Sequence, residues 1–219
     1  MAKMAFRPYD APMITLRRYQ PADLESLYAI SLATGEAGSD ASHLYADKRL
    51  IGLIYSAPYA VLKPDLALVA EDDQGIAGYA LGVPDTRSWE DHLEQAWWPA
   101  LRLRYPDPGP TPQEGWSADQ RRQFMIHHPG RTPQEIVAAF PAHLHLNLLP
   151  RSQGRGHGAA LLDAWLTEAG SDGVDAIHVG VNRGNSRAVR FWRKAGFADI
   201  TPPESVDSRT IWMGRRQDS

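Results

Sequence analysis

The chain has 219 residues, of which 43% are hydrophobic, a formal net charge of -3 at pH 7 and no cysteine. This composition excludes global disorder, disulfides, thiolate metal sites and cysteine nucleophiles, and the small charge gives no indication of a nucleic-acid or anionic-membrane partner. Because we find neither a signal sequence nor an apolar run of roughly 18 residues, we expect a soluble, cytoplasmic protein with a single domain over residues 1–219.

The first half of the chain predicts a strand, two helices and a hairpin after a loose N-terminal arm. Alternating apolar residues indicate strands, apolar residues at helical spacing indicate helices, and a glycine-bearing turn joins the two strands of the hairpin. In chain order, we expect the arm over 1–13, a strand over 13–18, helices over 21–32 and 42–57, and hairpin strands over 66–71 and 76–83.

Residues 84–141 have a different composition, with many prolines and four tryptophans: Trp89, Trp97, Trp98 and Trp116. Weak helical patterns occur near 88–104 and 117–126. The segment is either a small helical subdomain that covers a cleft or a separate binding module, and its length favours the former because it is short for an independent core. The tryptophans either form a wall for a bound molecule or fill the core, which is their commoner role.

Regular patterns return in the second half of the chain. We expect strands over 143–149, 176–182 and 209–214, and helices over 158–170 and 186–195. In the strand over 143–149, alternation places His143, His145 and Asn147 on one face and leucines on the other.

The passage from the first of these strands into the next helix is rich in glycine. Gln153-Gly154-Arg155-Gly156-His157-Gly158 lets backbone N–H groups converge at a helix N-terminus, which favours an anion, and Arg151 and Arg155 could add charged contacts. The loop lacks the lysine of a Walker motif, and it does not follow a first strand as a Rossmann loop does. The pattern therefore predicts either a phosphate cradle of another type or a plain turn.

Two segments resemble the GNAT acetyltransferase family. The family's cofactor loop is Gln/Arg-x-x-Gly-x-Gly/Ala, which Gln153, Gly156 and Gly158 match. The family's second segment, Asn-x-x-Ala-x-x-Phe/Leu-Tyr-x-x-x-Gly-Phe, is matched from Asn185 to Phe197 except at Trp192. The long insertion and the segment 141–150 also look like bacterial relatives of the acetyltransferase-like C-terminal domain of O-GlcNAcase, not all of which are active.

The resemblance implies an α/β (α+β) GNAT fold, in which a mixed, mostly antiparallel sheet is flanked by helices and splays into a V between its fourth and fifth strands. Acetyl-CoA would lie in that V, and the acceptor would be an amine of unknown identity under the insertion. The cofactor-binding residues implied are Leu148, Leu149, Gln153, Gly154, Arg155, Gly156, His157, Gly158, Asn182, Asn185 and Trp192.

Transfer to an amine requires a base and, for the thiolate, an acid. We expect His145 to be the base, with His143 as second choice, although histidines on such strands are more often structural; Asp175 and His178 are weaker candidates. The family's tyrosine acid is replaced by Trp192, which cannot donate a proton near neutral pH, and several other tyrosines could substitute for it. His127 and His128 lack a third metal ligand. Three hypotheses remain: an N-acetyltransferase, a non-catalytic acetyl-CoA sensor, and a nucleotide-binding enzyme.

Overall fold

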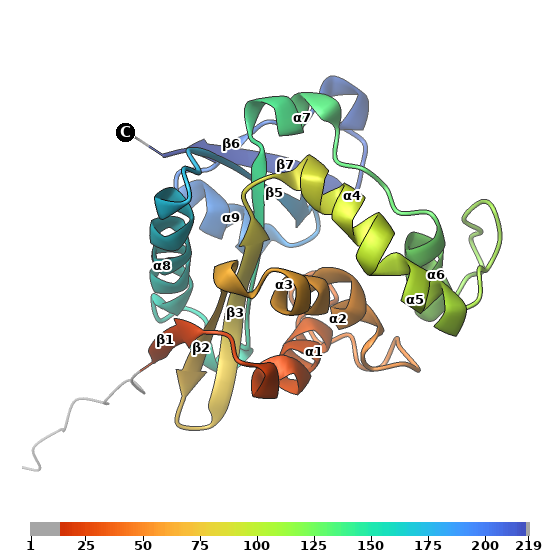
Figure 1. The fold of residues 1–219 in the computed structure, drawn as a ribbon, viewed down its shortest axis with the longest axis horizontal. Coiled ribbons are helices and arrows are strands. Elements are labelled where there is room, and N and C mark those ends of the chain that lie inside the picture. Colours follow the sequence, from red (N-terminus) through yellow and green to blue (C-terminus); the bar gives the residue numbers. More distant parts are fainter. Residues whose placement is uncertain (1–13, 218–219) are drawn as a thin grey trace, which may run out of the picture.

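The computed structural model describes residues 14–217 (Figure 1), and the arm expected over 1–13 lies outside them. The strands are β1 (Thr15–Arg18), β2 (Ala67–Asp72), β3 (Gly75–Val83), β4 (Ala142–Leu148), β5 (Ala176–Asn182), β6 (Ala198–Asp199) and β7 (Thr210–Arg216). The α-helices are α1 (Leu24–Ala33), α2 (Leu50–Tyr55), α3 (Ala57–Leu62), α4 (Thr86–Ala96), α5 (Trp98–Arg104), α6 (Ala118–His127), α7 (Gln134–Ala139), α8 (His157–Ser171) and α9 (Ser186–Lys194). Short 3₁₀ helices occupy Pro21–Asp23, Pro64–Leu66, Pro150–Ser152 and Pro203–Ser205.

The strands form one sheet in the order β1-β2-β3-β4-β5-β7-β6. Neighbouring strands pair antiparallel except for β4 and β5, which run parallel. This mixed, mostly antiparallel sheet with flanking helices confirms the expected fold class. The hairpin between β2 and β3 also forms as predicted: Gly75 adopts φ +102, which glycine accommodates without strain.

Helices cover both faces of the sheet (Figure 1). On one face, α8 packs across β2, β3 and β4, and its fully buried Trp165 donates a hydrogen bond to the Leu66 carbonyl at 3.0 Å. On the other face, α1, α2 and α3 form a second core with the helices of the insertion. Because side chains alternate along β4, Leu144 belongs to the α8 core, whereas His143 and His145 belong to the opposite face.

Two expected helices are each broken into two. The helix expected over 42–57 is wrong in extent: residues 42–49 form turns, and α2 and α3 meet at Ser56, with Pro58 in the first turn of α3. The pattern near 88–104 likewise divides at Trp97, with Pro99 in the first turn of α5. In both cases a proline supplies no N–H to continue the preceding helix. Within residues 14–217, no helix combines the length and apolar character needed to span a bilayer.

Candidate functional site

The parallel strands β4 and β5 separate soon after they begin. Their pairing is confined to Ala142 with Ile177 and His143 with His178, after which the strands diverge. Backbone groups of β4 beyond His143 that point toward β5 therefore have no strand to bond to, which is the splay that the resemblance implied.

The backbone hydrogen bonds of Leu149 bear on its predicted contact with the cofactor. The Leu149 N–H donates to the Ala77 carbonyl at 2.7 Å and its carbonyl accepts from Ser152 N at 2.9 Å, so Leu149 offers no backbone group to the V. Since successive residues of a strand point to opposite edges, the N–H of Leu148 faces the V instead. The Leu148 carbonyl already accepts a hydrogen bond from Gln153 Nε2 at 2.7 Å.

The glycine loop leaves a run of backbone donors without intramolecular partners. Gly154 and Gly156 adopt φ +72 and φ +84, so both need the left-handed conformation. Between Gln153, whose N–H bonds to Pro150, and Ala160, whose N–H bonds to Gly156, no described residue accepts a hydrogen bond from the backbone N–H groups of 154–159. These donors lie at and just before the N-terminus of α8, where a helix favours an anion.

Other residues of the loop have structural roles that sequence reasoning did not separate from phosphate binding. A Cβ on Gly158 would lie 3.2 Å from both the Leu148 and Phe191 side chains, so this glycine lets α8 pack closely against its neighbours. The His157 side chain is buried, whereas Arg155 is exposed. Gln153 holds the loop in place by bonding to Leu148 and Arg187.

The expectation that Arg151 contacts phosphate is wrong. Its guanidinium binds the Asp72 carboxylate at 2.8 and 3.2 Å and donates to the carbonyl of Ile76. Arg151 also holds the pKa of Asp72 below its ordinary value, chiefly through this hydrogen bond. The cation therefore fastens the loop to the β2–β3 hairpin, and Arg155 is the charged side chain of the loop that makes no ion pair with a described residue.

A cavity of about 590 Å³ opens on the same side of the sheet as His143 and His145. Its walls come from α1 to α3, the insertion, and strands β3, β4, β5 and β7. Asn182 and Asn185 line it, and Asn185 also caps α9 by accepting a hydrogen bond from the Ala188 N–H at 3.0 Å. Arg187, which sequence reasoning missed, connects this cavity to the loop because it bonds to both the Gly38 carbonyl and Gln153.

Trp192 does not face the cavity. Its side chain is 6% exposed and packs against Phe191 and Phe197 in the α8 core, so the structure gives no support to the predicted cofactor contact of this residue. The amphipathic helix α9 ends at Lys194 and places position 192 on its buried face. An indole N–H also supplies no acid at this position.

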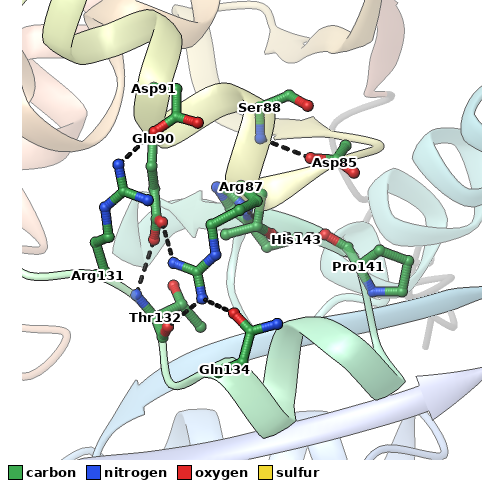
Figure 2. A network of polar contacts seen from close by, with 11 residues as sticks. Asp85, Arg87, Ser88, Glu90, Asp91, Arg131, Thr132, Gln134, Pro141 and His143 are labelled. Atoms are coloured by element: carbon green, nitrogen blue, oxygen red, sulfur yellow. Dashed lines mark hydrogen bonds and ion pairs between the residues drawn. The ribbon is translucent and has the colours of Figure 1, made fainter.

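The insertion forms part of the cavity wall and is fastened where it leaves and rejoins the sheet. Thr86, at the start of α4, donates from its N–H and its hydroxyl to the Pro141 carbonyl at 2.8 and 2.6 Å, which joins the two ends of the segment. Figure 2 shows that Arg87 and Glu90 of α4 also bond to the segment around Thr132. We call the Thr86–Pro141 contact the clasp.

The tryptophans of the insertion combine the two roles considered from the sequence. Trp89 and Trp98 are buried in the core and also line the cavity. Trp97 donates to the Leu53 carbonyl at 2.8 Å, and Trp116 packs against Phe124. Nothing in residues 14–217 forms a group of three or more metal-ligating side chains, and His127 and His128 instead bond to Tyr105 and Asp107.

A chain of hydrogen bonds runs from the clasp to His145. Thr86 Oγ1 lies 2.7 Å from His143 Nδ1, the Tyr59 hydroxyl lies 2.7 Å from His143 Nε2, and the same hydroxyl lies 3.1 Å from His145 Nε2. Tyr59 was one of several tyrosines that the sequence could not place.

The directions of these hydrogen bonds determine which nitrogen of each imidazole carries the proton. The single Thr86 hydroxyl proton goes to the Pro141 carbonyl, so His143 Nδ1 must be the donor to Thr86. His143 Nε2 then accepts from Tyr59, and the Tyr59 oxygen accepts from His145 Nε2–H. His145 Nδ1 is left with an unprotonated lone pair, as a base requires.

Burial keeps these imidazoles neutral. It lowers the pKa of His145 to about 4, lowers the pKa of His143 well below its ordinary value, and lowers that of His178, whose Nδ1–H donates to Phe140. Burial also raises the pKa of Tyr79 to about 12 and that of Tyr59 further, so neither tyrosine is a ready acid. His178 lines the cavity, whereas Asp175 is exposed and does not.

These lowered pKa values predict that acid destabilises the protein. Below about pH 6.5 the unfolded chain binds protons at His143, His145 and His178 that the folded protein does not, so the free energy of unfolding falls as pH falls. His145 alone should account for a loss of about 2 kcal/mol at about pH 5. Urea unfolding at about pH 7.5 and about pH 5 measures this, and His145→Gln should reduce the loss by that amount. An equal loss in both proteins would contradict the lowered pKa.

Comparisons with known proteins bear on this geometry. The model of the Acetyltransferase (GNAT) family matches residues 24–197. Protein O-GlcNAcase of Rattus norvegicus is 23% identical over 207 residues, which are 92% of this chain and 22% of that protein, so the chain spans less than a quarter of that relative. The SsHAT structure is 35% identical, with a TM-score of 0.85, over 95% of this chain and 100% of SsHAT. The structure of yncA from Salmonella typhimurium with its cofactor acetyl-CoA has a TM-score of 0.52 at 18% identity, over 94% of this chain and 95% of yncA, and shows a likeness of fold alone.

Proposed function

Because the chain belongs to the GNAT acetyltransferase family, we propose that it transfers the acetyl group of acetyl-CoA to an amine in the cavity under the insertion. The observation that carries the proposal is the run of unpartnered N–H groups over 154–159, which lies beside the splay between β4 and β5. On this proposal the whole chain acts as one acetyltransferase-like domain, with residues 84–141 as the roof of the acceptor site.

The residues of this chain fit acetyl-CoA in two places. The loop donors and the exposed Arg155 suit the diphosphate, and the Leu148 N–H suits an amide of the pantetheine arm. A bound thioester supplies an acetyl group that is already activated, so positioning contributes much of the rate. Asn182 and Asn185 line the opposite side of the V.

His145 is proposed to accept the proton of the attacking amine at Nδ1. A pKa near 4 keeps this atom unprotonated at neutral pH. Attack on the thioester makes the amine nitrogen strongly acidic, so even a weak base can accept its proton. Tyr59, which accepts from Nε2–H, holds the imidazole in the required tautomer and supports the imidazolium that forms.

One observation favours a second candidate, a protein that binds acetyl-CoA with little or no transfer. Position 192 holds a buried tryptophan, and the pKa values of the cavity tyrosines Tyr55, Tyr59 and Tyr79 are raised, mainly by burial. The departing thiolate then has no evident acid. Transfer nevertheless remains feasible because a thiolate is a good leaving group near neutral pH.

Calorimetry with acetyl-CoA, ATP and NAD tests the proposal, together with thiol release over a panel of amines. We expect acetyl-CoA to bind at least about 10-fold more tightly than either nucleotide, because only acetyl-CoA can also bond to the strand edge in the V. Thiol release above the hydrolysis background should follow with at least one amine. Tight binding without thiol release would support the second candidate, and nucleotide binding without acetyl-CoA binding would refute both.

A further inference from the structure

Arg122 of α6 lines the cavity, and each of its contacts is a neutral group. Its Nε donates to the Tyr45 hydroxyl at 3.0 Å, and its Nη1 donates to the Tyr55 hydroxyl at 3.0 Å and to Met125 Sδ at 3.2 Å. The guanidinium carbon lies 5.3 Å from the centre of the Tyr55 ring. Within residues 14–217, no carboxylate lies within 4 Å of this cation.

The other charged residues around the cavity do not neutralise the positive charge of Arg122. The charged residues of the lining are Arg122, Arg209 and Glu90, and Glu90 is already occupied because it accepts from Arg87 and from the Thr132 N–H. The lining therefore carries net positive charge. A cation that is partly withdrawn from water without a counter-ion is costly, and a bound anion would relieve that cost.

Two hydrogen-bond donors beside each other remain for such an anion. No described residue accepts from Arg122 Nη2, which carries two N–H groups. The Tyr55 hydroxyl accepts from Arg122, so its own proton points elsewhere, and the acceptor within its reach is the weak thioether of Met125 at 3.5 Å. A planar carboxylate can accept from a guanidinium and an adjacent hydroxyl at once.

Tyr55 lies beside the base as well as beside Arg122. The Tyr55 ring lies 5.9 Å from the His145 ring and also contacts Arg122, so a single tyrosine separates the cation from the imidazole. We infer that the acceptor is a small amine that carries a carboxylate, which binds Arg122 and Tyr55 while its amino group reaches His145. This inference rests on the proposed function and names the substrate class for that site.

Matched pairs of amines with and without the charge test the inference. Glycine, β-alanine and γ-aminobutyrate are compared with their amides, by calorimetry on the protein saturated with coenzyme A and by kcat/KM for thiol release. We expect at least one carboxylate to bind at least about 10-fold more tightly than its amide, with a similar gain in kcat/KM, since hydrogen bonds to charged groups are the stronger ones.

Variants separate the role of Arg122 from a general effect of charge. Arg122→Gln should remove the preference for the carboxylate, whereas Arg121→Gln should keep it, because Arg121 is exposed and lies outside the cavity lining. Tyr55→Phe should reduce the preference for the carboxylate several-fold. This variant provides the test if Arg122→Gln proves too unstable to purify.

The possible outcomes distinguish this inference from the proposed function. Equal binding of carboxylates and amides, or a preference that survives Arg122→Gln, would overturn the inference even if other amines are acetylated. Binding of a carboxylate that depends on Arg122 but gives no thiol release would support the anion site and count against the transferase. Absence of binding by both sets would also overturn the inference.

Discussion

Gly156→Asp should lower the affinity for acetyl-CoA by more than about 100-fold. The residue lies at the N-terminus of α8 among the unpartnered N–H groups, and a carboxylate there repels the diphosphate by about 4 kcal/mol per charge pair at about 4 Å in a partly solvated site. A Cβ at this position would meet no atom within 4 Å, so the fold should survive. Calorimetry with acetyl-CoA measures the change.

Gly156→Asn is the matched control for this substitution. Asparagine and aspartate have nearly the same size, and both tolerate the left-handed backbone of φ +84 better than most residues. We expect Gly156→Asn to lower the affinity by less than about 10-fold and to shift the melting temperature as much as Gly156→Asp does. If the two variants bound acetyl-CoA equally, the loop would not be holding the diphosphate.

His145→Gln should reduce kcat for acetyl transfer by about 100- to 1,000-fold with little change in the affinity for acetyl-CoA. The glutamine amide can still donate to the Tyr59 oxygen in place of Nε2–H, but it has no basic atom in place of Nδ1. The substitution therefore removes the base while keeping the hydrogen bond. Thiol release under saturating acetyl-CoA gives kcat, and calorimetry gives the affinity.

Two further variants show whether the effect belongs to this imidazole. His178→Asn keeps a donor to the Phe140 carbonyl and should change kcat by only a few-fold, although His178 also lines the cavity. Tyr59→Phe leaves His145 Nε2–H without its partner, so we expect a loss of about 1–3 kcal/mol in stability and a smaller loss in kcat. An unchanged kcat in His145→Gln would eliminate this residue as the base.

The features predicted correctly from the sequence depend on local residues. Gly75 closes the β2–β3 hairpin as predicted, because a glycine's freedom is a property of its own position. Alternation along β4 likewise placed His143 and His145 together on the face that opens on the cavity. The family resemblance supplied the order and the splay of the strands, which local patterns could not.

Sequence patterns could not place side chains whose partners are distant in sequence, as Arg151 and Tyr59 show. Arg151 was expected at the phosphate, but Asp72 binds it from 79 residues away. Tyr59, which fixes the tautomer of His145, is 86 residues from it, and no local pattern indicates such a contact. Trp192 was judged by its place in a motif, whereas packing against Phe197 decided its direction.

The clasp gives residues 84–141 an independence from the sheet that the loop over 153–158 lacks. Thr86 and Pro141 meet at one point on the sheet, so the chain between them enters and leaves at the same place. A roof of another length or shape could be grafted there without shifting the register of β3 against β4. If the cavity holds the acceptor as proposed, exchange of this segment would change the acceptor while the loop over 154–159 and His145 stay in place.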